Sequence, residues 1–162
     1  MILYLDASAL VKRYVSEPGS EEILRQIEEA EAVGTSGISR AEVAAALAKA
    51  ARLGLLPRED AQAAYRAFCQ EWTDFVRLPV GGGVIERAAD LAWEHGLRAF
   101  HAVQLAAAVF WQGALETPIF FASFDRRLWS AASAAGLIAS PDDLPGLLDS
   151  WKRAGGSGPL LL

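Results

Sequence analysis

Cysteine is nearly absent from this sequence, since Cys69 is the only one among 162 residues. A single cysteine excludes an internal disulfide, a CxxC redox pair and a multi-cysteine zinc site. Lysine is also scarce, with only Lys12, Lys49 and Lys152, and the formal net charge is −5. We therefore expect no binding to nucleic acid through bulk charge, although a local basic patch is compatible with this balance.

The sequence has no long apolar run that is free of polar side chains. Its most apolar stretch, residues 99–115, carries His101, Gln104 and Gln112 and is rich in alanine. That composition is typical of a buried helix and not of a membrane span. Residues 1–6 have no basic region, so we expect no signal peptide, and the single cysteine fits a cytoplasmic protein.

Short apolar runs alternate with amphipathic segments, and 52% of the residues are hydrophobic. Several runs lack polar alternation, which is typical of strands buried on both faces of a parallel sheet. The sequence therefore predicts an α/β fold. The expected strands cover residues 2–5, 32–36, 75–78, 118–122 and 137–139, and the expected helices cover residues 8–15, 21–27, 39–52, 57–72, 84–95, 99–115 and 124–135.

No internal repeat or linker interrupts residues 1–153, so we expect a single domain there. Residues 155–159 read Gly-Gly-Ser-Gly-Pro, which is turn and linker chemistry, and residues 154–162 are expected to form a tail outside the core. Apolar and aromatic side chains exceed what one small core is expected to hold, which predicts a symmetric homodimer with an apolar interface. These side chains include Tyr65, Phe68, Trp72, Trp93, Phe110 and Trp111.

Two acids follow the two clearest strands: Asp6 comes directly after residues 2–5, and Asp125 follows residues 118–122. In an open parallel sheet, sites collect at the carboxyl ends of the strands, near a switch in strand order. If the two strands are neighbours, about 4.8 Å apart, the two carboxylates can share one site. The alternative is a local role at the start of the next helix, where backbone N–H groups favour a carboxylate.

Glu42 and His101 have stronger local alternatives. Residues 39–42, Ser-Arg-Ala-Glu, match a capping box, which explains the glutamate without any site. A single histidine on an apolar helix is more often a core or rim residue than a ligand. The functional interpretation rests on position: Glu42 begins the helix after the second strand, and His101 lies near a helix start beside the strand ends.

Clustered carboxylates favour metal-assisted chemistry on an anion. Mg²⁺ and Mn²⁺ take oxygen ligands, and close carboxylates raise one another's pKa unless a cation lies among them. Such ions activate water and stabilise charge on a phosphodiester. No Ser–His or Cys–His pairing is evident, and Gly81-Gly82-Gly83 reads as a flexible loop because no Gly-Lys-Ser/Thr follows it. A phosphatase or receiver-like domain with a nucleophilic Asp6 is a rival that lacks a convincing Lys or Thr partner.

Basic residues near these positions are candidates for RNA binding. The alternative for each is a solvated surface charge. Several of them around an acidic pocket would form a track for RNA on an acidic protein. The candidates are Lys12, Arg13, Arg40, Arg98, Arg126 and Arg127.

Four segments in this order resemble the PIN domain, and most of all the VapC-type toxins of bacterial toxin–antitoxin pairs. They are Leu-Tyr-Leu-Asp-Ala-Ser-Ala-Leu at 3–10, Ser-Arg-Ala-Glu-Val at 39–43, Leu-Arg-Ala-Phe-His-Ala-Val-Gln-Leu-Ala at 97–106 and Ala-Ser-Phe-Asp-Arg-Arg-Leu at 122–128. Each segment alone is moderately specific for the family, whereas four of them in the same order are strong evidence of the resemblance. The resemblance spans residues 1 to about 140.

The resemblance implies a small three-layer α/β/α sandwich and a ribonuclease that depends on Mg²⁺ or Mn²⁺. It also implies a homodimer that a cognate antitoxin protein inhibits. Asp6, Glu42 and Asp125 match acidic positions around the metal, and Ser8 and Ser123 match hydroxyl positions that support the acids. We therefore predict that the three acids converge at one end of the sheet.

His101 departs from the family, which usually has Asp at this place. An imidazole suits Mn²⁺ or Zn²⁺ better than Mg²⁺ because it is softer than a carboxylate. Three interpretations stay open: an active enzyme with an altered metal preference, a weakened enzyme, or a fold kept for binding alone. We favour retained or altered activity because the three acids persist. The rival is a non-catalytic protein-binding module, and metal-dependent RNA cleavage separates the two.

Overall fold

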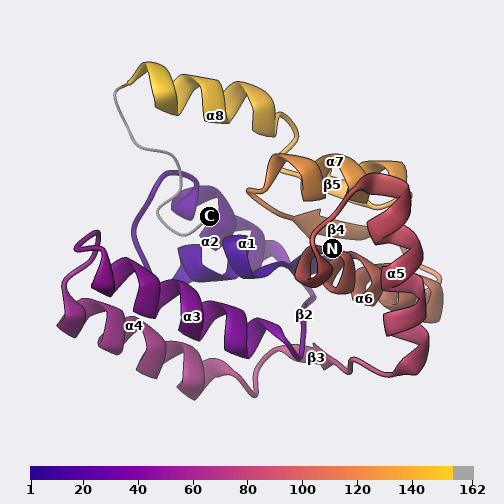
Figure 1. The fold of residues 1–162 in the computed structure, drawn as a ribbon, viewed down its shortest axis with the longest axis horizontal. Coiled ribbons are helices and arrows are strands. Elements are labelled where there is room, and N and C mark those ends of the chain that lie inside the picture. The colour runs from indigo at the N-terminus through magenta and orange to yellow at the C-terminus, as the bar shows by residue number, and fades with distance from the viewer. Residues whose placement is uncertain (155–162) are drawn as a thin grey trace.

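The computed structural model describes residues 1–154, in which a five-stranded parallel sheet is covered by helices (Figure 1). The strand order is β3-β2-β1-β4-β5. The predicted α/β/α sandwich with five strands is confirmed. The strands are β1 Ile2–Leu5, β2 Ala32–Ser36, β3 Val76–Leu78, β4 Ile119–Ala122 and β5 Ile138–Ser140. The helices are α1 Ala7–Leu10, η1 Val11–Arg13, α2 Ser20–Glu29, α3 Ser39–Arg52, α4 Arg58–Glu71, α5 Gly82–His95, α6 Ala99–Leu115, α7 Arg126–Ala134 and α8 Leu144–Arg153.

The strand order reverses at β1, the central strand. The chain runs outward from β1 through β2 to β3, then returns to the other side of β1 to form β4 and β5. β1 pairs in parallel with β4 and places Leu5 opposite Ala122. The residues that follow this pair, Asp6 and Ser123, therefore leave the sheet side by side at the switch point where parallel sheets build their sites.

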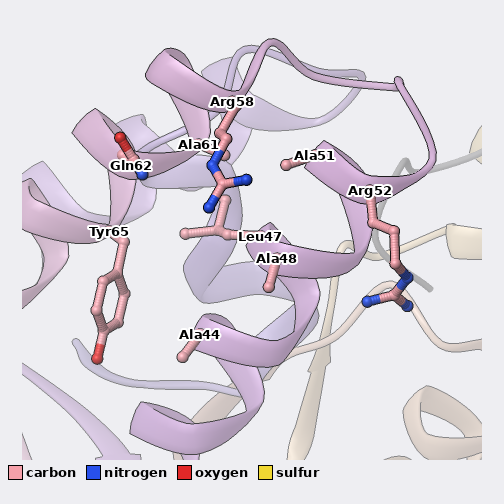
Figure 2. A pocket seen from close by; sticks show the side chains of 9 residues that line it. All are labelled: Ala44, Leu47, Ala48, Ala51, Arg52, Arg58, Ala61, Gln62 and Tyr65. Carbon is pink, nitrogen blue, oxygen red and sulfur yellow. The ribbon is translucent and has the colours of Figure 1, made fainter.

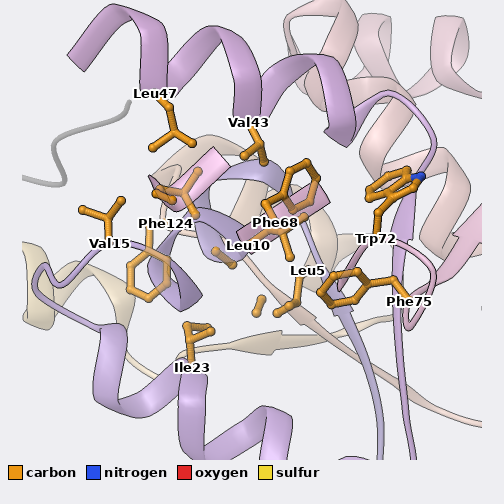
Figure 3. Packing of buried hydrophobic residues seen from close by; sticks show 14 of the residues in the cluster. Leu5, Leu10, Val15, Ile23, Val43, Leu47, Phe68, Trp72, Phe75 and Phe124 are labelled. Atoms are coloured by element: carbon orange, nitrogen blue, oxygen red, sulfur yellow. The ribbon is translucent and has the colours of Figure 1, made fainter. Parts of the chain in front are cut away.

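Alternate residues of β1 point to opposite faces of the sheet and anchor two apolar layers. Leu3 and Leu5 pack with side chains from α1, α2, α3 and α4. Figure 3 shows Leu5 and Leu10 beneath Val43 of α3, with Phe68 of α4 beside them. The other face is covered by α5, α6 and α7, and its central buried side chains are Tyr4, Leu91, Leu105, Phe121 and Leu128.

The six aromatic side chains that predicted a dimer differ in burial, and Tyr65 is half-buried against the core. Phe68, Trp72 and Trp111 are buried in the two layers, so the core holds more aromatic volume than the sequence analysis allowed. In contrast, Trp93 is 92% exposed and Phe110 is 48% exposed. The argument for a dimer is therefore wrong for the three buried residues, and it now depends on the exposed ones.

Two local expectations differ from the structure. Gly82 and Gly83 lie in the first turn of α5 with Gly81 as its N-cap, so the glycine run is a helix start and not a loop. The sequence analysis assigned no helix to residues 144–153, where α8 forms. Pro145 obscures this helix in the sequence, but proline is tolerated in a first turn because its missing N–H has no helical partner there.

No helix in residues 1–154 is long and apolar enough to cross a membrane. The predicted tail at 154–162 lies outside the described residues except for Ala154.

Candidate active site

Asp6 lies at the carboxyl end of the central strand and is 2% exposed. Its carboxylate caps α1 because Oδ1 accepts a hydrogen bond from the Ala9 N–H at 2.8 Å. Two hydroxyls also hold it: Ser8 Oγ donates to Oδ1 at 2.7 Å, and Ser123 Oγ donates to Oδ2 at 2.8 Å. The local capping role and a place in the site are therefore compatible. These neutral donors fix the carboxylate without neutralising its charge.

Asp125 follows β4, the strand that pairs with β1. Its carboxylate caps α7 by accepting the Leu128 N–H at 2.8 Å. Ser123 connects the two acids, since its hydroxyl donates to Asp6 and accepts the Asp125 N–H at 3.2 Å. The condition in the sequence argument therefore holds: the two strands are neighbours, and both acids line one pocket.

Glu42 does not form the capping box that residues 39–42 predict. α3 begins without a side-chain cap, and the Ser39 hydroxyl instead bonds with Thr35 Oγ1 at 2.7 Å. The Gln104 amide donates to Ser39 at 2.8 Å and also to the Glu42 carboxylate. This contact from α6 draws Glu42 into the pocket that the two aspartates line. The purely local explanation of Glu42 is therefore wrong.

α6 contributes His101 and Gln104, one helical turn apart. His101 Nδ1 lies 3.7 Å from Asp125 Oδ1, beyond hydrogen-bond distance. Gln104 is the site residue that the sequence analysis missed: it donates to Glu42 and accepts the Tyr4 hydroxyl at 2.6 Å. The sequence feature that could have identified Gln104 is its position three residues after His101 on an otherwise apolar helix, because residues i and i+3 share a helix face.

The pocket has a volume of about 490 Å³ and is lined by three carboxylates, with Lys49 and Arg98 also on its lining. Burial raises the pKa of Glu42 to about 7; donation from Gln104 opposes this shift, and the charge of Asp6 adds to it. Burial also raises the pKa of Asp6, although its hydrogen bonds act in the other direction. The predicted residues that line this pocket are Asp6, Ser8, Glu42, Arg98, His101 and Asp125.

The residues present fit a divalent cation. Close carboxylates that raise one another's pKa are stabilised by a positive charge among them, and oxygen donors suit a hard ion. Within residues 1–154, no group of three or more His, Cys, Asp or Glu side chains is arranged to hold a metal directly. An ion that keeps part of its water shell, as Mg²⁺ usually does, needs only one or two carboxylates as direct ligands.

Lys12 is wrong as an RNA contact. Its ammonium is buried, pairs with Glu17 at 2.6 Å and lies 4.1 Å from the centre of the Phe124 ring. The sequence gives no sign of this burial, because the helical turn of η1 turns Lys12 inward while its neighbour Arg13 stays half exposed.

The other basic candidates lie in different places. Arg13 pairs with Glu71 at 2.6 Å, and Arg40 lies over the Trp72 ring at 5.9 Å; neither lines the acidic pocket. The remaining three line a cleft of about 650 Å³ beside that pocket: Arg98, Arg126 and Arg127.

A third hollow, between α3 and α4, has a different chemistry (Figure 2). This groove of about 550 Å³ is lined by alanines with Leu47 and Tyr65, and Arg58 reaches over Leu47. No carboxylate lines it in the part of the chain that the structure describes. It therefore lacks the acid cluster that the pocket at the strand ends provides.

Comparison with known proteins gives matches to one family. Residues 3–133 match the family model of the PIN domain. Ribonuclease VapC45 of Mycobacterium tuberculosis (strain CDC 1551 / Oshkosh) is 35% identical over 144 residues, which cover 88% of this chain and 97% of that protein. Ribonuclease VapC49 of Mycobacterium tuberculosis (strain H37Rv) matches with the same identity and coverage. Ribonuclease VapC3 of Pyrobaculum aerophilum is 34% identical over 110 residues, or 67% of this chain and 82% of that protein.

Two solved structures share the fold. VapBC2 from Rickettsia felis, bound to a DNA fragment from its promoter, matches with a TM-score of 0.54 at 12% identity and covers 77% of this chain and 88% of that chain. FitAcB from Neisseria gonorrhoeae matches with a TM-score of 0.57 at 21% identity and covers 85% of this chain and 94% of that chain. At these identities the likeness concerns the fold alone.

Proposed function

We propose that this chain, which belongs to the PIN domain family, is an endoribonuclease that hydrolyses RNA phosphodiester bonds with Mg²⁺ or Mn²⁺. The observation that carries the proposal is the shared pocket of Asp6, Glu42 and Asp125 at the carboxyl ends of β1 and β4 and at the start of α3. The curated relatives that cover most of this chain are named ribonucleases, which supports the same activity.

The acids and the serines of the pocket have different roles in this proposal. Asp6, Glu42 and Asp125 would hold the metal ion, which when bound activates water and stabilises charge on the phosphodiester. Ser8 and Ser123 fix the Asp6 carboxylate through hydrogen bonds of 2.7 and 2.8 Å, so its oxygens are oriented before the ion arrives. The burial of Asp6 limits the water around its carboxylate, which strengthens its interaction with a cation.

His101 stands where the family usually has Asp, and it lines the pocket beside Asp125. We propose that the enzyme is active with an altered metal preference, because an imidazole favours Mn²⁺ over Mg²⁺ compared with a carboxylate. The same substitution favours the second candidate, a PIN-fold protein that has lost catalysis and binds a protein partner. The lack of a preformed metal cluster within residues 1–154 is also compatible with that candidate.

The partners belong to the same proposal. The Rickettsia felis structure is named for VapBC2, which supports an antitoxin protein as the partner that inhibits this chain. The RNA that the chain cleaves would then be cytoplasmic. A homodimer would cover the exposed Trp93 and Phe110 on α5 and α6. A single domain over residues 1–153 also stays a proposal, since the family model ends at residue 133.

The test is cleavage of a mixed RNA pool with Mg²⁺ or Mn²⁺, measured for the wild type and for Asp6→Asn. The variant keeps the shape of the side chain but removes a buried negative charge, so we expect cleavage to fall about a thousandfold or more. Asp74→Asn, at an exposed loop position, is the matched control and should leave the rate unchanged. If the wild type cleaves no RNA with either metal, the binding-module candidate replaces the nuclease.

A further inference from the structure

The cleft beside the acidic pocket is lined by three arginines, Arg98, Arg126 and Arg127, and by one acid, Asp125. Arg98 precedes α6 and lines both hollows, whereas Arg127 lies on α7 and lines the cleft alone. Arg127 Nη1 donates to the Gly96 carbonyl at 2.9 Å, which fixes its guanidinium while leaving its charge unpaired. Neither arginine forms an ion pair in the part of the chain that the structure describes, in contrast with Arg126, which pairs with Asp149 at 3.1 Å.

The two hollows form one continuous surface, because Arg98, His101 and Asp125 line both of them. Asp125 is the acid that the cleft shares with the pocket, and His95 at the end of α5 adds a further polar group. Lys49, about two helical turns after Glu42 on α3, also lines the pocket. The acids therefore share one surface with the positive side chains of Lys49, Arg98 and Arg127, an arrangement that suits binding of a polyanion.

Phe100 adds a second kind of contact to this surface. Its ring is 62% exposed, yet it lines the acidic pocket one residue before His101. An exposed aromatic ring beside phosphate-binding groups is the element on which proteins stack unpaired bases, and it is tolerant of base identity. Bases within a duplex are already stacked and cannot use it.

We infer that a single strand of RNA crosses the molecule from the Lys49 side, over Phe100 and the acids, into the cleft of Arg98 and Arg127. This inference rests on the proposed function for the identity of the strand. Phe100 stacks on a base next to the scissile phosphate, and the two arginines bind the phosphates that follow. The path assigns roles to residues that the metal site does not use.

The arginine step is tested by binding of a labelled single-stranded RNA in EDTA, where no metal supports cleavage, over a series of KCl concentrations. Each lost phosphate contact lowers the slope of log K against log salt by about 0.7. We expect Arg98→Ala/Arg127→Ala to reduce the slope by about 1.4 and the affinity by about tenfold. Arg66→Ala/Arg153→Ala, which removes two exposed arginines outside both hollows, is the matched control and should change neither value.

The stacking step has a different signature. Phe100→Leu removes the ring but keeps an apolar side chain, and we expect affinity to fall about tenfold with no change in the salt slope, since stacking is not ionic. Phe100→Tyr should restore binding. Leu53→Ala, which shortens an exposed apolar side chain outside both hollows, should leave RNA binding unchanged. A change in sedimentation of Phe100→Leu without a change in RNA binding would assign the ring to an interface between protein copies and overturn this step.

The outcomes separate the path from the activity. If the wild type cleaves RNA but the double arginine variant keeps its affinity and slope, the path is wrong and the nuclease stands. If the variants change binding as expected but no metal supports cleavage, the path stands and the nuclease is wrong. Tighter binding of a duplex than of the single strand of the same sequence would also overturn the path.

Discussion

Two regions of this molecule bury charge, and they do so in opposite ways. Under α8, the Lys12 ammonium pairs with Glu17 at 2.6 Å, and both side chains are almost completely buried. At the strand ends, Asp6 and Glu42 are held by hydroxyls and an amide, which donate hydrogen bonds but carry no charge. The first region is neutral as a pair, whereas Asp6 and Glu42 form no ion pair within residues 1–154 and leave a negative charge that a bound cation can offset.

The difference distinguishes a structural charge from a functional one. Burial lowers the pKa of Lys12, and the Glu17 carboxylate, with a smaller contribution from Asp6, counteracts that shift. Burial raises the pKa of Glu42, and the nearby Asp6 carboxylate adds to the shift. Charged pairs that offset each other stabilise one conformation, whereas like charges held together mark a site that has been arranged for a ligand.

The largest expected effect is on the neutral region. Lys12→Met keeps a long apolar stem but removes the buried ammonium that pairs with Glu17, so we expect the free energy of unfolding to fall by about 3–5 kcal/mol. Urea denaturation measures this loss. Adding Glu17→Gln to the same protein should recover much of it, because both charges of the buried pair are then removed.

Arg25→Met is the matched control, since Arg25 pairs with Glu22 and Glu29 on an exposed helix face where such pairs contribute little. If Lys12→Met were as mild as Arg25→Met, the comparison between the two regions would fail.

A smaller effect of opposite sign is expected at Glu42. Its pKa of about 7 lies above the usual 4.5, so the charged carboxylate opposes folding above pH 7, and this opposition fades as the pH falls towards 4.5. In EDTA at pH 8, Glu42→Gln should therefore raise the free energy of unfolding by about 2 kcal/mol, after allowance for partial solvation. Near pH 4.5 the difference should vanish.

Two further measurements sharpen this result. Mg²⁺ or Mn²⁺ should stabilise the wild type more than Glu42→Gln, because the ion binds the native pocket and the variant has one ligand charge fewer. Glu28→Gln, on the exposed face of α2, should show neither the gain at pH 8 nor its loss at low pH. If Glu42→Gln is less stable than the wild type at pH 8, the charged Glu42 carboxylate does not destabilise the folded protein and the prediction is wrong.

Much of the fold follows from local pattern. The apolar run at residues 2–5 becomes the central strand, and Asp6 and Asp125 each follow a strand, so their placement depended only on those strands being neighbours. The acids also cap the helices that they precede, which shows why the local and functional interpretations were not alternatives. One carboxylate can accept backbone N–H groups and still line a pocket.

The errors at the site concern contacts between residues that are distant in the sequence. Glu42 matches a capping box locally, but Gln104 lies 62 positions away and draws the carboxylate into the pocket. Lys12 looks exposed in the sequence, yet the rings of Phe124 and Trp151 lie over its ammonium at 4.1 and 5.6 Å. Neither contact has a period or motif, because each depends on how separate helices pack on the sheet.

The smallest expected effect comes from adding a negative charge to the acidic pocket. It tests whether further acid in this region improves metal-dependent cleavage. His101→Asp introduces a hard oxygen ligand beside Asp125, whose Oδ1 lies 3.7 Å from His101 Nδ1. We expect Mg²⁺-supported RNA cleavage to rise about tenfold, so that the ratio of the rate with Mn²⁺ to the rate with Mg²⁺ falls. His101→Asn is the matched control, since it has nearly the shape of Asp without the charge, and it should not reproduce the gain. Equal rates and metal preferences for the wild type and both variants would make His101 a structural residue and reduce the site to the three acids.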